Sequence, residues 1–243
     1  MLKAVMFDYG GTLVTSIGDD IMPLVSEGAK LAHAYLQNTI ESVPPFPAFF
    51  TAAAQAIQGA YVRVAATPNE MDAEEVIHDV LKNLGLPVSD EQFRKFAREW
   101  QKPFTAKTNL NEGAKESLDA LKKRGLKLAV ISNNIWPQSF LEEELARLGV
   151  MEYFDYIVTS SRHGMKKPHA PIFEDALAAL GVAAEETAFV GDSIKEDVAG
   201  ASMLGMKTVL LDWKREEMPG VEPDAKIQSL SELPGVLMNP GEK

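Results

Sequence analysis

Two carboxylates, far apart in the chain, each follow a short apolar run with the composition of a buried strand. Asp8 comes directly after Ala4–Phe7, and Asp192 comes after a run ending at Val190, with only Gly191 between. Runs this short and apolar indicate strands of a parallel sheet. Ligands bind outside the carboxyl ends of such strands, so both carboxylates are expected at one ligand-binding edge. Because Asp shortly before glycine is also ordinary turn chemistry, Asp8 does not identify a site alone.

A positive charge is needed between two carboxylates that meet at one edge, since both cannot stay ionised without it. Mg²⁺ prefers oxygen ligands and combines one or two carboxylates with water and substrate phosphate oxygens. Asp8 and Asp192 therefore predict a magnesium site. The Gly10-Gly11 pair after Asp8 would let a ligand approach the backbone closely.

Further polar residues lie at a strand end or a helix start. Ser132 and Asn133 follow the apolar letters L-A-V-I, and a hydroxyl beside backbone N–H groups can hold phosphate oxygens. Lys167 lies where Pro168 and Pro171 fix the start of a helix, so its ammonium group could neutralise an anion. Each has a plainer explanation, a loop or a solvated lysine. Together with the two carboxylates they form a set suited to phosphoryl transfer.

The elements that must position these residues alternate between helix and strand in the second half of the chain. Helices are expected over about 112–124, 139–148, 171–180 and 195–204, and strands over 127–131, 156–159, 188–190 and 208–211. A short strand and a helix near 230–237 are expected to follow. This alternation predicts right-handed crossovers and a doubly wound α/β fold with a parallel sheet covered on both faces.

Residues 18–107 have a different pattern, with helices predicted over about 21–36, 49–65, 73–84 and 90–100 and no strand between them. Asp72 with Glu75, and Ser89 with Gln92, have the spacing of capping boxes. The first strand must join the later sheet, because one strand beside helices alone would not be stable. We therefore expect a discontinuous α/β core, residues 1–17 and 108–243, with an inserted helical cap domain, residues 18–107.

Composition narrows the class of protein. The 243 residues carry a formal charge of −11 and no Lys/Arg run, which counts against nucleic acid or an anionic membrane as partner. The absence of cysteine excludes disulfides and thiolate chemistry and fits an intracellular protein. Met1 to Lys3 lead directly into the first strand without room for a signal peptide, and no apolar stretch has membrane-spanning length. A cytoplasmic protein is expected.

Four motifs in order, F-D-Y-G-G-T-L, V-I-S-N, K-K-P with a following I-F, and V-G-D-S with Asp197, resemble those of the haloacid dehalogenase superfamily of hydrolases. The resemblance covers the whole chain, and the helical insert is similar to the family's smaller cap. It implies that Thr12 fixes the loop that carries the nucleophile. It also implies that Asp197 orients the lysine or a metal-bound water.

The same resemblance implies the main chemical roles. Asp8 would attack phosphorus to form an aspartyl phosphate, Ser132 and Lys167 would hold the transferring group, and Asp192 would bind Mg²⁺. The expected substrate is a small phosphorylated compound. The expected activity is that of a magnesium-dependent phosphatase.

Gly10 departs from the family pattern. The family's phosphatases carry a second aspartate two residues after the nucleophile, which protonates the leaving group and then activates water. The Gly10 carbonyl can still bind magnesium, but no side chain remains to move a proton. General acid–base catalysis contributes about 10²- to 10⁴-fold, so alkyl phosphates should suffer most and aryl or acyl phosphates least. Asp19 or Asp20 near the hinge could substitute, or could simply cap a helix.

Other activities remain open. The superfamily's dehalogenases also lack the second aspartate but use no metal, whereas G-D-S with two aspartates resembles a metal-binding form. Phosphonate cleavage would need a Schiff-base lysine in the cap, for which Lys30 is a candidate by position only. A binding or regulatory protein that keeps the fold and the metal with little turnover is also consistent with Gly10. Trp136 could line the pocket mouth or be buried under the cap.

Overall fold

β1 (Ala4–Phe7) lies in the middle of the sheet, and all of its residues are buried and need cover on both faces. It pairs in parallel with β2 (Lys127–Ser132) on one side and β4 (Thr187–Gly191) on the other. β3 (Tyr156–Thr159), β5 (Lys207–Leu211) and β6 (Ala225–Ile227) complete a six-stranded parallel sheet in the order β3-β2-β1-β4-β5-β6. The computed structural model describes residues 1–18, 20–215 and 217–238. The predicted parallel sheet is confirmed.

The strand order places the ends of β1 and β4 at a topological switch point. From β1 the chain moves outward through β2 to β3, and it then returns to β4 on the opposite side of β1. Phe7 lies opposite Val130 in one neighbour and Val190 in the other. Crevices form where neighbouring crossovers diverge to opposite faces, and ligands bind there. Asp8 and Asp192 therefore emerge side by side at the crevice.

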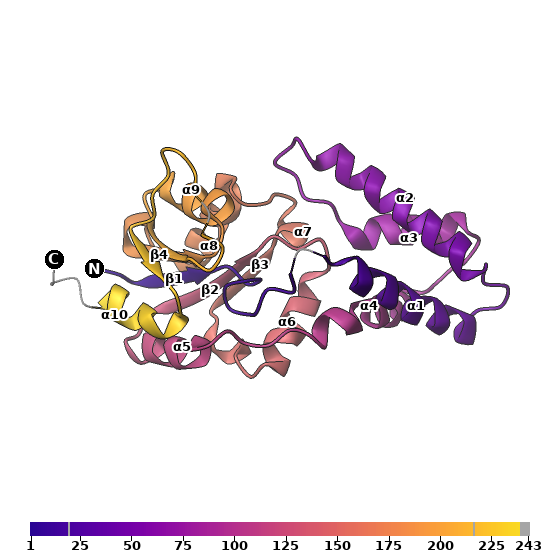
Figure 1. Cartoon of the computed structure of the whole chain (residues 1–243), viewed down its shortest axis with the longest axis horizontal. Helices are drawn as coiled ribbons and strands as arrows, with labels where there is room; N and C mark the ends of the chain where they lie inside the picture. The colour runs from indigo at the N-terminus through magenta and orange to yellow at the C-terminus, as the bar shows by residue number, and fades with distance from the viewer. Residues whose placement is uncertain (19, 216, 239–243) are drawn as a thin grey trace.

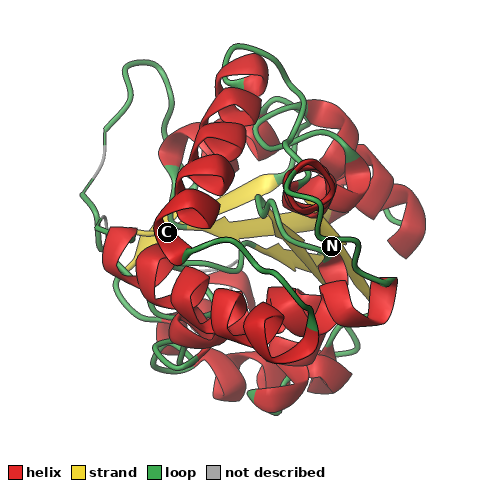
Figure 2. Cartoon of the chain, turned by 90° about the vertical axis from the view of Figure 1, so that its right-hand side faces the viewer, coloured by secondary structure: helices red, strands yellow, loops and turns green. Residues whose placement is uncertain are grey.

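Helices cover both faces of the sheet (Figure 2). The main ones are α5 (Ala114–Lys123), α6 (Gln138–Arg147), α8 (Ala170–Leu180), α9 (Ala199–Ser202) and α10 (Leu233–Met238). Val5 and Phe7 belong to the apolar cluster with α5, α6 and α10, whereas Ala4 and Met6 belong to the cluster with α8 and α9. This alternation along β1 follows from the two-residue period of a strand. The described chain also has the short elements α7 (Ser160–His163), η1 (Met151–Tyr153), η2 (Ala184–Glu186), η3 (Ile194–Val198) and η4 (Leu230–Glu232).

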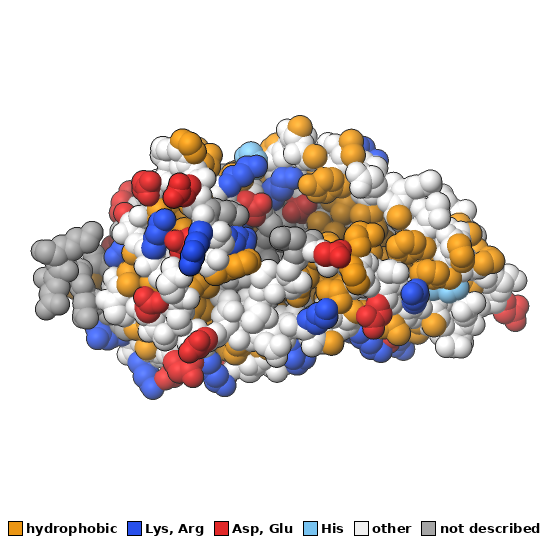
Figure 3. All heavy atoms as spheres, in the orientation of Figure 1, with side chains coloured by type: hydrophobic (Ala, Val, Ile, Leu, Met, Phe, Trp, Pro, Cys, Tyr) orange, Lys and Arg blue, Asp and Glu red, His pale blue; other side chains and the backbone are white. Residues whose placement is uncertain are grey.

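A helical layer lies beyond the carboxyl end of the sheet (Figure 1). It consists of α1 (Met22–Thr39), α2 (Phe46–Val64), α3 (Ala73–Asn83) and α4 (Asp90–Thr105). These helices share an apolar cluster of their own, centred on Phe49, Phe96 and Trp100, and Trp136 packs against it from the sheet side. The surface is hollowed between the two parts, with hydrophobic side chains on the helical side of the hollow (Figure 3). No described helix is long and apolar enough to cross a membrane.

Close packing explains how α1 and α4 approach each other. A Cβ on Gly28 would lie 2.0 Å from the backbone oxygen of Trp100, so only glycine allows this contact. The capping box predicted at Ser89 and Gln92 is confirmed. Asp72 caps α3 by accepting hydrogen bonds from the backbone N–H groups of Glu74 and Glu75.

Several helix predictions were wrong in detail; α4, for example, continues to Thr105, beyond the expected end at about residue 100. α2 begins at Phe46 instead of Phe49. Pro45 precedes the helix, and Pro47 is tolerated in its first turn because no helical hydrogen bond is lost there. The single helix expected over 195–204 is replaced by the π-helical turn η3 followed by α9. The wider turn brings the Asp197 carboxylate back under Gly191, where a Cβ would lie 2.3 Å from it. π-Helical turns of this kind are frequent at functional sites.

Candidate active site

Three carboxylates and one ammonium group meet at the switch point. Asp8, Asp192 and Asp197 are all buried, and each offers an oxygen within 4.8 Å of the others. Lys167 is 1% exposed, and its Nζ donates to Asp8 Oδ1 at 2.8 Å and to Asp197 Oδ1 at 2.6 Å. Asp8 and Asp192 follow β1 and β4, Asp197 lies in η3, and Lys167 precedes α8, so segments far apart in the chain build the cluster.

Burial and charge act against each other in this cluster. Burial alone would lower the pKa of Lys167, but the carboxylates of Asp197 and Asp8 outweigh burial and raise that pKa. Burial raises the pKa of Asp197, against the opposing effect of Lys167. Burial and then the charge of Asp8 raise the pKa of Asp192. A further positive charge beside Asp192 would therefore stabilise the ionised carboxylates.

Asp197 joins the lysine to the turn that carries Asp192. While Oδ1 accepts from Lys167, Oδ2 accepts from the backbone N–H groups of Asp192 at 3.1 Å and Ser193 at 3.0 Å. Asp197 thus fixes the position of both neighbours.

Ser132 is the last residue of β2 and Asn133 follows it, on the side of β1 away from β4. The Asn133 side chain donates to the Lys167 carbonyl at 3.0 Å and accepts from the Lys167 backbone N–H at 2.8 Å. It also donates to Glu196 Oε2 at 3.1 Å. The side chain of Asn133 therefore holds the lysine loop. Ser132 is buried and lines the same cavity as Asp8.

The cavity above these residues has a volume of about 450 Å³ and a mainly polar wall. Its lining comprises Asp8, Tyr9, Gly10, Ser132, Asn133, Asn134, Asp192, Ser193, Glu196, Asp197 and Lys214. Gly10, in this wall, and the following Gly11 differ in the space around them. A Cβ on Gly11, which has φ +84°, would lie 2.2 Å from Asp192 Oδ2, whereas a Cβ on Gly10 would meet nothing within 4 Å. Position 11 requires glycine because the Asp192 carboxylate approaches it closely, whereas position 10 has room for a side chain.

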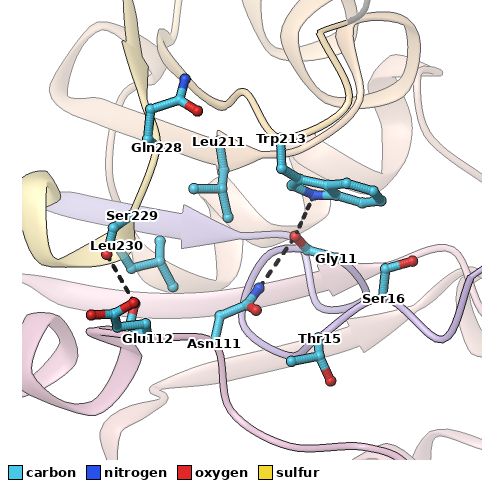
Figure 4. Close-up of a pocket in the computed structure, with 10 residues that line it drawn as sticks. All are labelled: Gly11, Thr15, Ser16, Asn111, Glu112, Leu211, Trp213, Gln228, Ser229 and Leu230. Carbon is cyan, nitrogen blue, oxygen red and sulfur yellow. Dashed lines mark hydrogen bonds between the residues drawn. The ribbon is translucent and has the colours of Figure 1, made fainter.

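The loop after Asp8 is held through its backbone carbonyls (Figure 4). Asn111 Nδ2 donates to the carbonyls of Thr12 at 2.8 Å and Val14 at 3.2 Å, and lies 3.3 Å from that of Gly11. Trp213 Nε1 donates to the Gly11 carbonyl at 3.0 Å. The buried Thr12 hydroxyl makes no hydrogen bond within the described chain. Asn111 and Trp213 therefore hold this loop, and the role of Thr12 stays a prediction.

Lys214 is a cavity residue that the sequence motifs did not indicate. Its Nζ lies 2.8 Å from Asp192 Oδ2 and 5.0 Å from the centre of the Trp213 ring. The only sequence signal is its position shortly after β5, at the same edge of the sheet. Lys214 brings a second ammonium group to the cavity.

The cap candidates lie apart from the cluster. Asp20 is exposed and accepts from the Met22 backbone N–H at 3.3 Å, near the start of α1. Lys30 is exposed on α1. Asp19 lies outside the described residues. The structure brings neither Asp20 nor Lys30 into the cavity wall beside Asp8.

The donor set fits a hard divalent cation. Asp8 and Asp192 offer carboxylate oxygens, and Gly10 lies in the same wall with a backbone carbonyl. Asp192 Oδ2 is buried and pairs with Lys214 Nζ at 2.8 Å. Oxygen-only ligands beside a polar cavity are what Mg²⁺ requires.

Comparison with known proteins is consistent with this geometry. Residues 2–205 match the family described as haloacid dehalogenase-like hydrolase. A glyceraldehyde 3-phosphate phosphatase from Methanocaldococcus jannaschii is 40% identical over 126 residues, covering 51% of this chain and 54% of that protein. The enzyme of the same name from Pyrococcus abyssi is 28% identical, covering 86% and 81%. The chain spans about half the length of the first curated relatives that it matches.

A solved structure shows the same fold over the whole chain. The 2-haloacid dehalogenase from Pseudomonas syringae has a TM-score of 0.68 and 23% identity, with 99% of this chain and 100% of that chain covered. The family match itself extends over most of the residues, including every motif named above. The resemblance inferred from the sequence is confirmed, and this chain belongs to the haloacid dehalogenase-like hydrolase family.

Proposed function

We propose that this chain is a magnesium-dependent phosphatase that acts on a small phosphorylated compound through an aspartyl phosphate on Asp8. The observation that carries the proposal is the buried contact of Asp8 with Lys167 in a polar cavity that also holds Asp192. The names of the two phosphatase relatives support the reaction class. The alternative, a phospho-ligand-binding or regulatory protein, shares this geometry and differs only in turnover.

Each residue of the catalytic cavity has its own role in the transfer of the phosphoryl group to Asp8. The Asp8 oxygen that does not accept from Lys167 attacks phosphorus, and the bond from phosphorus to the leaving oxygen breaks. Lys167 neutralises negative charge on the transferring group, with Ser132 and the backbone of Asn133 on the other side. Asp8, Asp192 and the Gly10 carbonyl would hold Mg²⁺, which supplies Lewis-acid stabilisation of phosphoryl oxygens when bound.

The second half of the reaction releases phosphate. Water attacks phosphorus of the aspartyl phosphate, the bond from phosphorus to Asp8 breaks, and the carboxylate is restored. Asp197 keeps Lys167 and the Asp192 turn in place during both steps. Gly10 supplies no proton, so the leaving oxygen must depart as an anion or take its proton from water.

The helical layer would control access to this chemistry. We propose the division into a core of residues 1–17 and 108–243 and a cap of residues 18–107, supported by the separate apolar cluster of α1–α4. Closure of a cap over the cavity would exclude water and select the substrate. We also propose a cytoplasmic location, in keeping with the absence of cysteine.

Phosphate release is the first test of the proposed function. With aryl, acyl and alkyl phosphates as substrates, we expect release that requires Mg²⁺, stops with a chelator and favours good leaving groups. No release from any substrate by a protein that still binds Mg²⁺ would favour the binding or regulatory alternative. Halide release from 2-haloacids without metal would contradict phosphatase chemistry.

Gly10→Asp is expected to raise turnover of alkyl phosphates by about 10- to 100-fold, with a smaller effect on aryl phosphates. The side chain has room, and Gly10 is not among the glycines with positive φ. Gly10→Asn is the matched control, because its amide has similar size but cannot donate and recover a proton in the same way. Comparison of kcat for both variants separates proton transfer from side-chain volume. An equal gain in the two variants would refute the missing-acid explanation.

A further inference from the structure

A second cavity of about 900 Å³ lies between α4 and α6. It shares two wall residues, Tyr9 and Asn134, with the catalytic cavity. Tyr9 follows Asp8 in the chain, and Asn134 comes two residues after Ser132, so the shared wall starts beside the reacting groups. The cavity is therefore in a position to receive whatever is attached to the phosphoryl group at Asp8.

The wall of this second cavity is mainly apolar and includes several aromatic side chains. Phe104 comes from α4, Trp136 from the loop after β2 and Phe140 from α6. The charged side chains in the wall all have partners of opposite charge in the described chain: Arg98 with Glu143, Lys102 with Glu99, and Arg147 with Glu144. An occupant therefore has no unpaired charge to meet there.

Two buried polar atoms in the wall are left without a hydrogen-bond partner in the described residues. They are the Tyr9 hydroxyl and Gln101 Nε2. Burial raises the pKa of Tyr9, which keeps the phenol neutral. Buried donors left unpaired are costly, so a ligand that offers an acceptor would bind better than one that does not. An aromatic group with an attached carbonyl or ether oxygen meets both requirements.

We propose that this cavity holds the organic group of the substrate and that the substrate is an aryl phosphate whose ring carries a hydrogen-bond acceptor. This inference rests on the phosphatase function proposed above. Two separate features lead to the same class: the aromatic wall favours an aromatic ring, and Gly10 restricts efficient turnover to leaving groups such as phenolates that depart without protonation. Trp136 and Phe104 select the ring, and Gln101 selects the acceptor.

Phosphonates are not hydrolysed, so their affinities report binding to the second cavity independently of phosphoryl transfer. With Mg²⁺ present, calorimetry is expected to show benzylphosphonate binding more tightly than methylphosphonate to the unmodified chain. Trp136→Ala should weaken benzylphosphonate binding about tenfold and leave methylphosphonate binding nearly unchanged. Tyr61→Ala, on an aromatic residue of α2 that is 57% exposed, is the control and should change neither.

The acceptor is tested with a matched pair of substrates. Gln101→Met should raise KM for 4-acetylphenyl phosphate several-fold more than KM for 4-ethylphenyl phosphate, because only the first can accept a hydrogen bond. Equal affinity for the two phosphonates, or a Trp136→Ala variant that binds both as before, would overturn the cavity assignment even if phosphate is released. Selective benzylphosphonate binding without any turnover would instead overturn the phosphatase proposal and leave the cavity assignment standing.

Discussion

Asp8→Asn is expected to abolish phosphate release, with kcat lower by about 10⁴-fold or more. An amide oxygen is a poor nucleophile and does not form the covalent phosphoryl ester. The variant should still fold, because the amide oxygen can accept from Lys167 as Asp8 Oδ1 does at 2.8 Å. Initial rates of phosphate release and the circular dichroism spectrum check both halves of the prediction.

Asp212→Asn provides a matched control for the loss of one carboxylate. Asp212 follows β5 and pairs with Lys226 at 3.6 Å, and it is not part of the catalytic cavity wall. Its activity should stay within about twofold of that of the unmodified chain, because this carboxylate lies outside the wall of the catalytic cavity. Normal turnover by Asp8→Asn would eliminate Asp8 as the nucleophile.

Lys167→Met should remove both activity and a large part of the stability. The substitution conserves length but leaves the carboxylates of Asp8 and Asp197 buried without their shared cation. Breaking a buried pair in this way costs about 3–5 kcal/mol of unfolding free energy. Urea denaturation measures this loss. Because burial already raises the pKa of Asp197, the deficit should shrink as the pH falls and the carboxylates take up protons.

The neighbouring lysine serves as the control for this prediction. Lys166 lies 3.4 Å from the Val64 carbonyl and touches none of the three carboxylates in the interactions described. Lys166→Met should therefore lose less than about 1 kcal/mol. If Lys167→Met were as stable as Lys166→Met, the buried ion-pair cluster would not be a structural determinant of the fold.

Those parts of the site that depend on local patterns were predictable from the sequence. An all-apolar run such as Ala4–Phe7 has few alternatives to a central strand, and polar residues after such strands must gather at one edge. Prolines near Lys167 likewise marked a helix start, and α8 begins at Ala170. The capping box at Ser89 followed from a short-range spacing.

The parts of the site that depend on contacts between distant segments were not predictable. Asn111 holds the loop after Asp8 by donating to the Thr12 carbonyl, which is 99 residues away in the sequence. The sequence around Asn111 contains no motif. Lys214 meets Asp192, which is 22 residues earlier in the chain, and no motif surrounds the lysine. The π-helical turn at Asp197 has nearly the same hydrophobic pattern as a helix, so periodicity could not distinguish them.

The covalent intermediate gives the most direct test of the proposed chemistry. The chain would be mixed with phenyl phosphate and Mg²⁺, quenched in acid during turnover, digested and analysed by mass spectrometry. We expect one phosphoryl group on the peptide that contains Asp8, and none after chelation or in Asp8→Asn. Phosphate release with Asp8 unmodified throughout, or a phosphoryl group on another residue, would contradict the assignment of Asp8 as nucleophile.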